Sequence, residues 1–293
     1  MRYAISSWIY GDEPLDQTLS RLARYGYEAV ELVGEPERLA PEEVGAVCRA
    51  HGLRVSAVLS WSIFGIPGRD LASPDGHERA QAIRYARACV DLAEAVGAPI
   101  VVVIPAAAGR TAPGGNPATE VDWRRGYQDE WKRAVDSVRQ AAEYAAPRGV
   151  SLALEPINRY ETFLVTNLDQ ATSFLEDVGS DSVKLHLDTF HMNLEEVDPA
   201  AAIHRAGAHL VNMHVSDSNR QAPGRGHTDF RRILSALREI AYPGVLALEP
   251  VPPGSNPLLS VRMTENLPLR DRYAEEGIRF LRSLEAELEA AKV

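Results

Sequence analysis

The stretch that decides the fold reads Val183-Lys184-Leu185-His186-Leu187-Asp188. An apolar residue occupies every second position, which is the period of a β-strand that buries one face. The same period recurs in residues 151–155, 212–214 and 245–249, where Leu or Met alternates with small or polar side chains. The sequence therefore predicts four strands that pack Leu and Met against other elements and point their remaining side chains the opposite way.

The rest of the chain repeats this rhythm of short apolar runs and longer amphipathic segments. Candidate strands occupy residues 3–6, 29–33, 54–60, 100–104, 150–155, 183–188, 209–214 and 245–249. Candidate helices occupy residues 15–25, 41–51, 74–96, 123–146, 168–178, 199–205, 230–240 and 271–290. Eight strands, each followed by a helix, predict an α/β fold, the (β/α)8 TIM barrel. No break in composition divides the chain, so we predict a single domain over residues 1–293.

Capping residues mark several predicted helix ends. Ser73 and Asp198 each precede a proline, and a capping side chain before proline is typical of a first helical turn. Gly26, Gly97 and Gly179 directly follow predicted helices, as glycine does where the chain leaves a helix in the left-handed conformation. These signals support the predicted order of elements.

Composition excludes several classes of protein. The 293 residues carry 31 Lys+Arg against 41 Asp+Glu, a formal net charge of −10. Nucleic acids and anionic membranes attract basic surfaces, so we expect neither as a partner. The chain has two cysteines and begins without the pattern of a secretory signal, and its longest apolar run, residues 98–108, is too short to span a bilayer. We therefore expect a cytoplasmic location.

Four consecutive predicted strands end on a potential metal ligand. Alternate strand residues of a TIM barrel face its lumen, and the chemistry of this fold collects at the carboxyl ends of the strands. Buried carboxylates that converge would repel one another, and a divalent cation is their natural counter-charge. Oxygen donors with one imidazole and no thiolate favour Mn²⁺, Co²⁺ or Mg²⁺. The sequence thus predicts a metal site made by Glu155, Asp188, His214 and Glu249; solvated strand ends or helix caps are the alternative.

Further polar and aromatic residues near these strand ends allow two interpretations each. His186 precedes Asp188 by two positions and is predicted to be a core histidine rather than a ligand. Glu31 ends the second predicted strand, where it either reaches the site or lies on the surface. Residues 223–227 form either a phosphate-binding loop or a simple turn. Trp8 and Trp61 either stack on a ligand or fill the loops.

Three motifs carry a family resemblance; they read Glu155-Pro156-Ile157-Asn158-Arg159-Tyr160-Glu161, Asp188-Thr189-Phe190-His191-Met192-Asn193 and His214-Val215-Ser216-Asp217-Ser218-Asn219-Arg220. They resemble the sugar isomerase/epimerase superfamily with a xylose-isomerase-like barrel. Within it, the chain is most similar to the ketose 3-epimerases of the D-tagatose and D-psicose (allulose) group. The resemblance extends over nearly the whole chain.

The resemblance implies a role for each motif residue. It places a divalent metal, Mn²⁺ first with Co²⁺ or Mg²⁺ as alternatives, on Glu155, Asp188, His214 and Glu249. It makes Glu155 and Glu249 the catalytic acid/base pair. It assigns substrate oxygens around C1 to C3 to Glu161, His191 and Arg220. It also implies a small-molecule ketose substrate and a homodimer or homotetramer.

The implied activity is metal-dependent epimerisation of a ketose at C3 through a cis-enediolate. Two other enzymes on the same barrel remain alternatives: an aldose–ketose isomerase, including the hydroxypyruvate type, and a keto-inositol dehydratase. A zinc endonuclease of the abasic-site type would need more histidines and a basic face, which the net charge of −10 disfavours. The substrate-binding residues also have plainer interpretations: Glu161 and His191 as loop caps, and Arg220 in a surface ion pair with Asp217. The particular ketose and its phosphorylation stay open.

Overall fold

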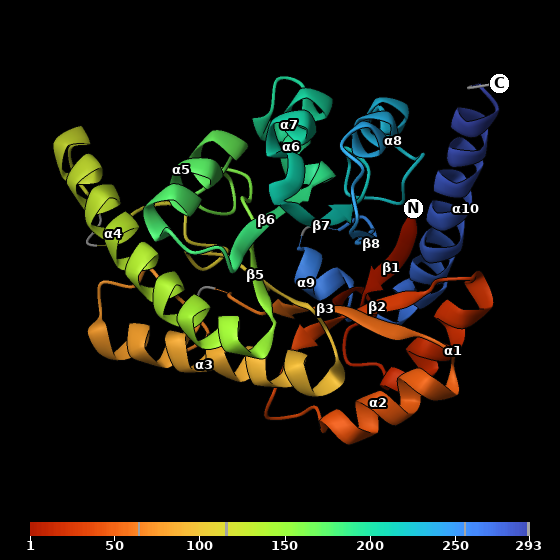
Figure 1. Cartoon of the computed structure of the whole chain (residues 1–293), viewed down its shortest axis with the longest axis horizontal. Helices are drawn as coiled ribbons and strands as arrows, with labels where there is room; N and C mark the ends of the chain where they lie inside the picture. The colour runs from red at the N-terminus through yellow and green to blue at the C-terminus, as the bar shows by residue number, and fades with distance from the viewer. Residues whose placement is uncertain (64, 115–116, 255, 292–293) are drawn as a thin grey trace.

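Eight parallel strands close into a barrel in the order of the sequence (Figure 1). The computed structural model describes residues 1–63, 65–114, 117–254 and 256–291. The strands are β1 (Arg2–Ser6), β2 (Ala29–Gly34), β3 (Arg54–Ser60), β4 (Ile100–Val103), β5 (Ser151–Leu154), β6 (Val183–Asp188), β7 (Leu210–Val215) and β8 (Val245–Leu248). Every predicted strand is present with nearly its predicted bounds. The predicted (β/α)8 TIM barrel is confirmed.

Most of the helices surround the barrel and cover the outer face of its strands, whereas the short helix at Pro257–Ser260 lies at the barrel mouth, where its Pro257 and Leu258 line a cavity (Figure 1). They are α1 (Leu15–Tyr25), α2 (Pro41–Ala50), α3 (Gly76–Val96), α4 (Glu120–Ala145), α5 (Leu168–Val178), α6 (Thr189–Glu195), α7 (Pro199–Ala206), α8 (Phe230–Glu239), α9 (Pro257–Ser260) and α10 (Leu267–Ala290). Short 3-10 turns are η1 (Ser7–Tyr10), η2 (Ala146–Arg148), η3 (Gly207–His209) and η4 (Thr264–Asn266). The N-terminal amino group lies beside α10, 2.6 Å from a carboxylate oxygen of Glu285, so the last helix is fastened to the first strand.

Of the two helix caps predicted before a proline, the structure confirms one and places the other at a different residue. The Asp198 side chain accepts hydrogen bonds from the N–H groups of Ala200 and Ala201, so the predicted cap of α7 is confirmed. The predicted cap Ser73 of α3 is wrong. The helix begins later, at Gly76, and its cap is Asp75, whose carboxylate accepts from His77 N and Glu78 N. An ionised carboxylate is the better acceptor for two N–H groups, which is why the start moves past Pro74.

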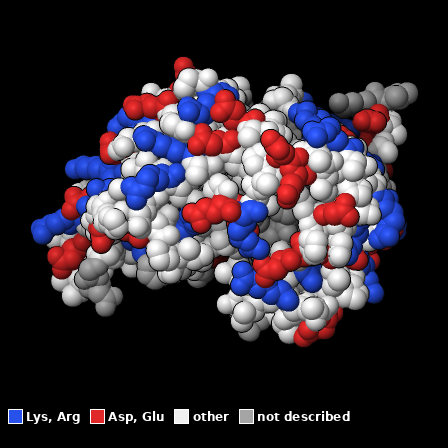
Figure 2. Space-filling model, turned by 90° about the horizontal axis from the view of Figure 1, so that it is seen from below, with Lys and Arg blue, Asp and Glu red and all other residues white. Residues whose placement is uncertain are grey.

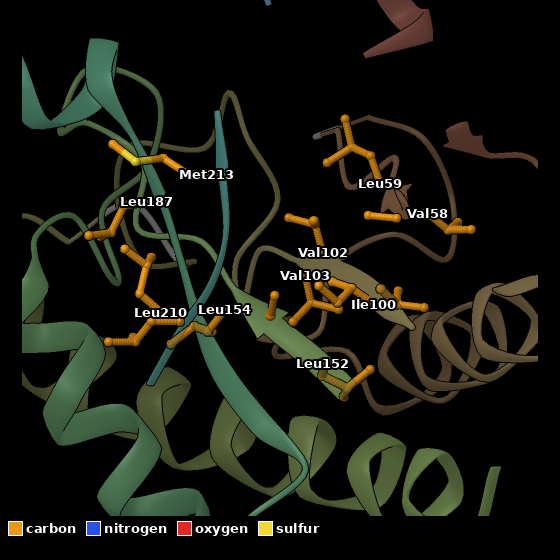
Figure 3. Packing of buried hydrophobic residues seen from close by; sticks show 14 of the residues in the cluster. Val58, Leu59, Ile100, Val102, Val103, Leu152, Leu154, Leu187, Leu210 and Met213 are labelled. Carbon is orange, nitrogen blue, oxygen red and sulfur yellow. The ribbon is translucent and has the colours of Figure 1, made fainter. Parts of the chain in front are cut away.

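The apolar core lies between the strands and the helices (Figure 3). The Leu and Met side chains of the alternating stretches, such as Leu152, Leu187 and Met213, are fully buried in this layer. Burying a side chain of this size contributes about 1.5–3 kcal/mol to folding. The opposite parity faces the lumen, where four small or β-branched residues of β1, β2 and β8 form a separate buried cluster: Ala4, Ala29, Val245 and Ala247. Polar residues such as Glu31, His186 and Asn212 are also buried in the barrel.

A β-bulge between β6 and β7 determines which of their residues lie side by side at the barrel mouth. Leu185 of β6 pairs with Leu210 of β7, but the next residue, His186, pairs with Asn212, so Val211 is an extra residue in β7. Beyond this bulge Asp188 lies opposite His214. Bulges near the active ends of barrels re-aim side chains. The two predicted ligands on β6 and β7 thus become neighbours at the barrel mouth.

The outer surface mixes charges of both signs. On the face shown in Figure 2, acidic and basic side chains are interspersed rather than gathered into one field. None of the described helices combines the length and apolar character needed to cross a membrane.

Candidate metal centre and active site

The structure gathers the four predicted ligands inside the barrel mouth. Glu155, Asp188, His214 and Glu249 are each between 1% and 3% exposed, so none is a solvated strand end. Nδ1 of His214 lies 3.4 Å from Oε1 of Glu155 and 3.3 Å from Oε2 of Glu249. Glu155 and Glu249 follow β5 and β8 directly and keep backbone hydrogen bonds to the neighbouring strands, to Val103 and Val215. These hydrogen bonds therefore fix the backbone positions of Glu155 and Glu249 at the barrel mouth.

Asp188 has two functions at the end of β6. Its Oδ1 accepts a hydrogen bond from Phe190 N at 2.7 Å and caps α6, a helix that the sequence did not predict. Its Oδ2 is buried without a hydrogen-bond partner among the described residues and lies 3.6 Å from Nε2 of His191. The capping bond leaves one carboxylate oxygen directed toward the other ligands.

The donor set fits a divalent cation. Nδ1 of His214, like Oδ2 of Asp188, is buried and lacks a hydrogen-bond partner within the described part of the chain. Glu155 contributes to two overlapping groups whose ligand atoms lie within 4.8 Å of one another, one with Asp188 and His191 and one with His186 and His214. Unsatisfied buried polar atoms are costly, and a bound ion would satisfy these. Carboxylate and imidazole donors match the preferences of Mn²⁺, Co²⁺ and Mg²⁺.

The electrostatics of the cluster follow from its burial. The pKa of Glu249 is raised to about 7: burial is the largest cause, and the nearby carboxylates of Asp188 and Glu155 add to it against the opposing effect of His214. Burial also raises the pKa of Glu155. Burial alone would lower the pKa of His214, but the carboxylates of Glu249, Glu31 and Glu155 raise it well above its usual range. Burial and the mutual repulsion of the carboxylates thus favour the protonated forms of Glu155 and Glu249, an effect that a bound cation would oppose.

Two lumen residues adjoin His214 from below. Glu31 is fully buried, and its Oε1 lies 2.7 Å from Nε2 of His214, so the surface position considered for it is wrong. His186 is fully buried as predicted for a core histidine, but its ring also packs edge-on against His214 with centroids 4.0 Å apart. Nε2 of His186 lies 3.6 Å from Oε1 of Glu155. Neither contact is visible in the sequence, because both depend on strand register across the lumen.

The three predicted substrate-binding residues line the space above the cluster. Nη1 of Arg220 lies 3.1 Å from Oε1 of Glu161, and its Nη2 lies 3.9 Å from Oε2 of Glu249. The guanidinium also rests over the ring of Phe190, 4.7 Å from its centroid. Within the described residues its side chain forms no ion pair with Asp217, so the surface-pair alternative is wrong. Arg220 instead lies in the cavity between Glu161 and Glu249.

His191 is held as a neutral donor. Burial lowers its pKa to about 3. Asn158 approaches Nδ1 with its side-chain Nδ2 at 2.8 Å and with its backbone N at 3.3 Å. Because both approaching groups are donors, Nδ1 is the acceptor and the proton resides on Nε2. Nε2–H is therefore available to an acceptor in the cavity.

A cavity of about 470 Å³ opens over the cluster. Its lining includes Trp8, Trp61, Ile104 and Leu258 besides the polar residues described above. Trp8 has a role that the sequence left open between stacking and loop packing: its Nε1–H donates to Oε1 of Glu249 at 2.6 Å. A pocket with apolar walls and a few convergent polar groups is typical of a small-molecule site.

Residues 19–284 match the family model described as Xylose isomerase-like TIM barrel. The chain belongs to this family. Among relatives of the xylose isomerase-like barrel, it is 32% identical to L-ribulose 3-epimerase of Mesorhizobium japonicum over 256 residues, which cover 85% of this chain and 80% of that protein. It is 40% identical to D-psicose 3-epimerase of Ruminiclostridium cellulolyticum over 121 residues, 41% of each chain.

Two solved structures show the same architecture as this chain. The structure of an L-ribulose 3-epimerase superposes with a TM-score of 0.82 at 27% identity, covering 100% of this chain and 98% of that chain. The D-psicose 3-epimerase of Clostridium cellulolyticum H10, solved with D-tagatose, shares the fold with a TM-score of 0.83 at 24% identity, covering 97% of this chain and 99% of that one.

Backbone N–H groups in and just after the loop at residues 223–227 bind the side-chain carboxylate of Asp217. The carboxylate of Asp217 accepts hydrogen bonds from the backbone N–H groups of Gly224 at 2.8 Å and Thr228 at 3.1 Å. A Cβ added at Gly226 would lie 2.3 Å from Oδ1 of Asp217, which explains the glycine there. The donors expected for a phosphate are thus used internally, and the loop is a turn rather than a phosphate cradle.

Proposed function

We propose that this protein is a divalent-metal-dependent ketose 3-epimerase. The observation that carries the proposal is the convergence of Glu155 and Glu249 on one atom, Nδ1 of His214, at 3.4 and 3.3 Å. The two glutamates follow β5 and β8, which are separated by β6 and β7 around the barrel. Inverting a carbon requires a proton acceptor and a proton donor on opposite faces, and carboxyl groups arriving from separated strands supply such a pair. Relatives named L-ribulose 3-epimerase and D-psicose 3-epimerase support this reaction class.

The proposed metal ligands are Glu155, Asp188, Nδ1 of His214 and Glu249. When bound, a divalent cation polarises a substrate carbonyl and stabilises the negative charge left when a proton leaves the neighbouring carbon. Mn²⁺ is the first choice, with Co²⁺ and Mg²⁺ as alternatives, because the set is rich in oxygen and contains no thiolate.

The proposed substrate-binding residues offer complementary groups. Arg220 presents two N–H groups anchored by Glu161 at 3.1 Å, and a planar guanidinium suits two adjacent oxygens. His191 presents Nε2–H as a neutral donor, since Asn158 occupies its Nδ1. These donors would hold the oxygens around C1 to C3 and present the C3 hydrogen to the glutamates.

The two glutamates are suited to move a proton. Burial raises the pKa of Glu249 to about 7, and a carboxyl that titrates near neutrality takes up and releases a proton readily. The indole of Trp8 fixes Oε1 of Glu249, so this carboxyl cannot turn away from the cavity. We propose that one glutamate removes the C3 proton and the other returns a proton to the opposite face.

The proposed substrate is an unphosphorylated ketose. The Asp217 carboxylate fills the loop that a phosphate would use, and the relatives are named for L-ribulose and D-psicose. The cytoplasmic location and the homodimer or homotetramer expected from the sequence stay predictions.

A product analysis tests the proposal. The protein would be incubated with Mn²⁺ and a panel of ketoses in deuterated water, and the exchanged carbon would be located by NMR. We expect the C3 epimer with deuterium at C3. An aldose product with deuterium at C1 or C2 would instead support the aldose–ketose isomerase, and loss of water would support the keto-inositol dehydratase. Glu155→Gln and Glu249→Gln should each abolish epimerisation, with metal content measured alongside.

A further inference from the structure

Glu31 lies on the far side of His214 from the proposed metal ligands. Its Oε1 lies 2.7 Å from Nε2 of His214, and its Oε2 accepts a hydrogen bond from Nδ2 of Asn212 at 2.9 Å. Glu31 comes from β2, whereas His214 and Asn212 come from β7, and β1 and β8 separate these strands in the barrel. The carboxylate therefore spans the lumen to reach the imidazole. None of the roles assigned above uses it.

Hydrogen bonds stabilise the buried carboxylate of Glu31. Its side chain is fully buried, and an isolated carboxylate without solvent is strongly destabilising. Two hydrogen bonds directed at its two oxygens remove this penalty. The Asn212 amide donates to Oε2 of this carboxylate, and a donated hydrogen bond stabilises its ionised form. Glu31 is thus kept as an anion that faces one nitrogen of His214.

An ionised carboxylate can only accept a hydrogen bond. Nε2 of His214 must then carry a proton, and in a neutral ring Nδ1 keeps the lone pair. Nδ1 is the nitrogen that faces Glu155 and Glu249 and lacks a hydrogen-bond partner among the described residues. We propose that Glu31 is a positioning residue that fixes the Nε2–H tautomer of His214, so that Nδ1 is the atom offered to the cation. The proposal rests on the metal centre of the proposed function.

A second placement of the ion uses the other side of the ring. Ligand atoms of Glu31, His214 and Glu249 also lie within 4.8 Å of one another. However, Nε2 and Oε1 of Glu31 are only 2.7 Å apart, a hydrogen-bond distance that leaves no room for an ion between them. Ligands about 2.1 Å from a cation in octahedral geometry lie about 3 Å apart. The distances of 3.3 and 3.4 Å around Nδ1 are close to this spacing.

Mn²⁺ affinity measured by chelator competition tests the role of Glu31. The variant Glu31→Gln keeps the shape of the side chain but removes its charge. We expect about a 10- to 100-fold loss of Mn²⁺ affinity, the usual effect of changing a group that orients a histidine ligand. Glu130→Gln is the matched control: Glu130 is equally buried but pairs with Arg110 at 2.5 Å and Gly114 N at 2.6 Å, away from His214. The control should bind Mn²⁺ like the wild type, and thermal unfolding of both metal-free variants reports any general loss of fold.

The position of the imidazole proton provides a readout that a merely structural residue would not change. In [¹⁵N]histidine-labelled protein loaded with diamagnetic Mg²⁺, the wild type should show a hydrogen-bonded Nε2–H on His214 and a metal-shifted Nδ1. In Glu31→Gln the Nε2–H resonance should broaden or move toward the value of a free imidazole. A proton on Nδ1 of the loaded wild type would overturn the proposal. Mn²⁺ bound equally by wild type and Glu31→Gln would also overturn it and leave the metal centre standing, whereas a wild type that binds no Mn²⁺ would overturn the metal centre itself.

Discussion

Trp8 is the residue through which the first loop of the barrel reaches the proposed acid/base pair. Its Nε1–H donates to Oε1 of Glu249 at 2.6 Å, and a donor to a carboxylate stabilises the ionised form. Trp8→Phe keeps the ring and removes the donor, so the pKa of Glu249 should rise further. If Glu249 acts as a base, the acid limb of the pH dependence of kcat/KM should move to higher pH. Trp61→Phe is the control, since Trp61 lines the same cavity and packs beside the Trp8 ring, but its indole donates no hydrogen bond to Glu249 among the described residues. An equal shift in both variants would contradict this role.

Arg220 is the second residue whose chemistry can be tested alone. Its two terminal nitrogens face Glu161 and Glu249, and a lysine would offer a single point charge in their place. We expect Arg220→Lys to lower kcat/KM about 10- to 100-fold, the loss of one charged hydrogen bond, while metal content and fold stay unchanged. Arg159→Lys is a matched control from the same face, because Arg159 is exposed and pairs only with Glu195 among the described residues. Wild-type kinetics in Arg220→Lys would remove Arg220 from the site.

At the scale of elements, the sequence predicted every strand but not how the strands fit together. The alternation in residues 183–188 was enough to place β6, since each apolar side chain has a packed position outside the barrel. The contact of Glu31 with His214 could not be predicted, because it depends on register around the ring and on the extra residue Val211 in β7. Helix α6 was also missed, because seven residues are too few to show a helical period.

The loop between β7 and α8 is the element that presents Arg220, and Asp217 organises it. Its carboxylate accepts from the backbone of Ser218, Gly224 and Thr228. Burial opposes ionisation of Asp217, but these backbone hydrogen bonds lower its pKa below the usual value. A lowered folded-state pKa contributes stability above the unfolded value of about 3.9 and loses it as the pH falls through the folded value.

Asp217→Asn should therefore destabilise the protein by about 1–3 kcal/mol near neutral pH, the effect of weakening hydrogen bonds to a charged acceptor. The difference from wild type should shrink as the pH falls below about 4, where Asp217 protonates in the unfolded wild type, and should be lost once the pH has fallen through the lower folded-state pKa. Urea unfolding of both proteins across this pH range measures it. A difference that is independent of pH would show that the charge of Asp217 does not organise the loop.

At the scale of the whole molecule, the barrel concentrates negative charge on nearly buried side chains beneath its cavity. The carboxylates of Glu31, Glu155, Asp188 and Glu249 are all buried, and Arg220 brings a positive charge close to Asp188, Glu155 and Glu249. The closed ring of strands holds these groups together even though they repel. The repulsion between these carboxylates should lower the free energy of unfolding of the metal-free protein. Binding of a divalent cation should raise it.

Binding at a concentration 100-fold above Kd stabilises a folded protein by about 2.7 kcal/mol. Mn²⁺ should therefore raise the Tm of the wild type by several degrees, and a chelator should reverse the change. Glu155→Gln sharpens the test because it removes one of the repelling charges together with one ligand. Its metal-free form should melt above the metal-free wild type, while Mn²⁺ should no longer raise its Tm appreciably. Differential scanning calorimetry with and without Mn²⁺ measures both effects. If Glu155→Gln lowered the Tm of the metal-free protein and kept the full response to Mn²⁺, neither the repulsion nor the metal ligand would lie at Glu155.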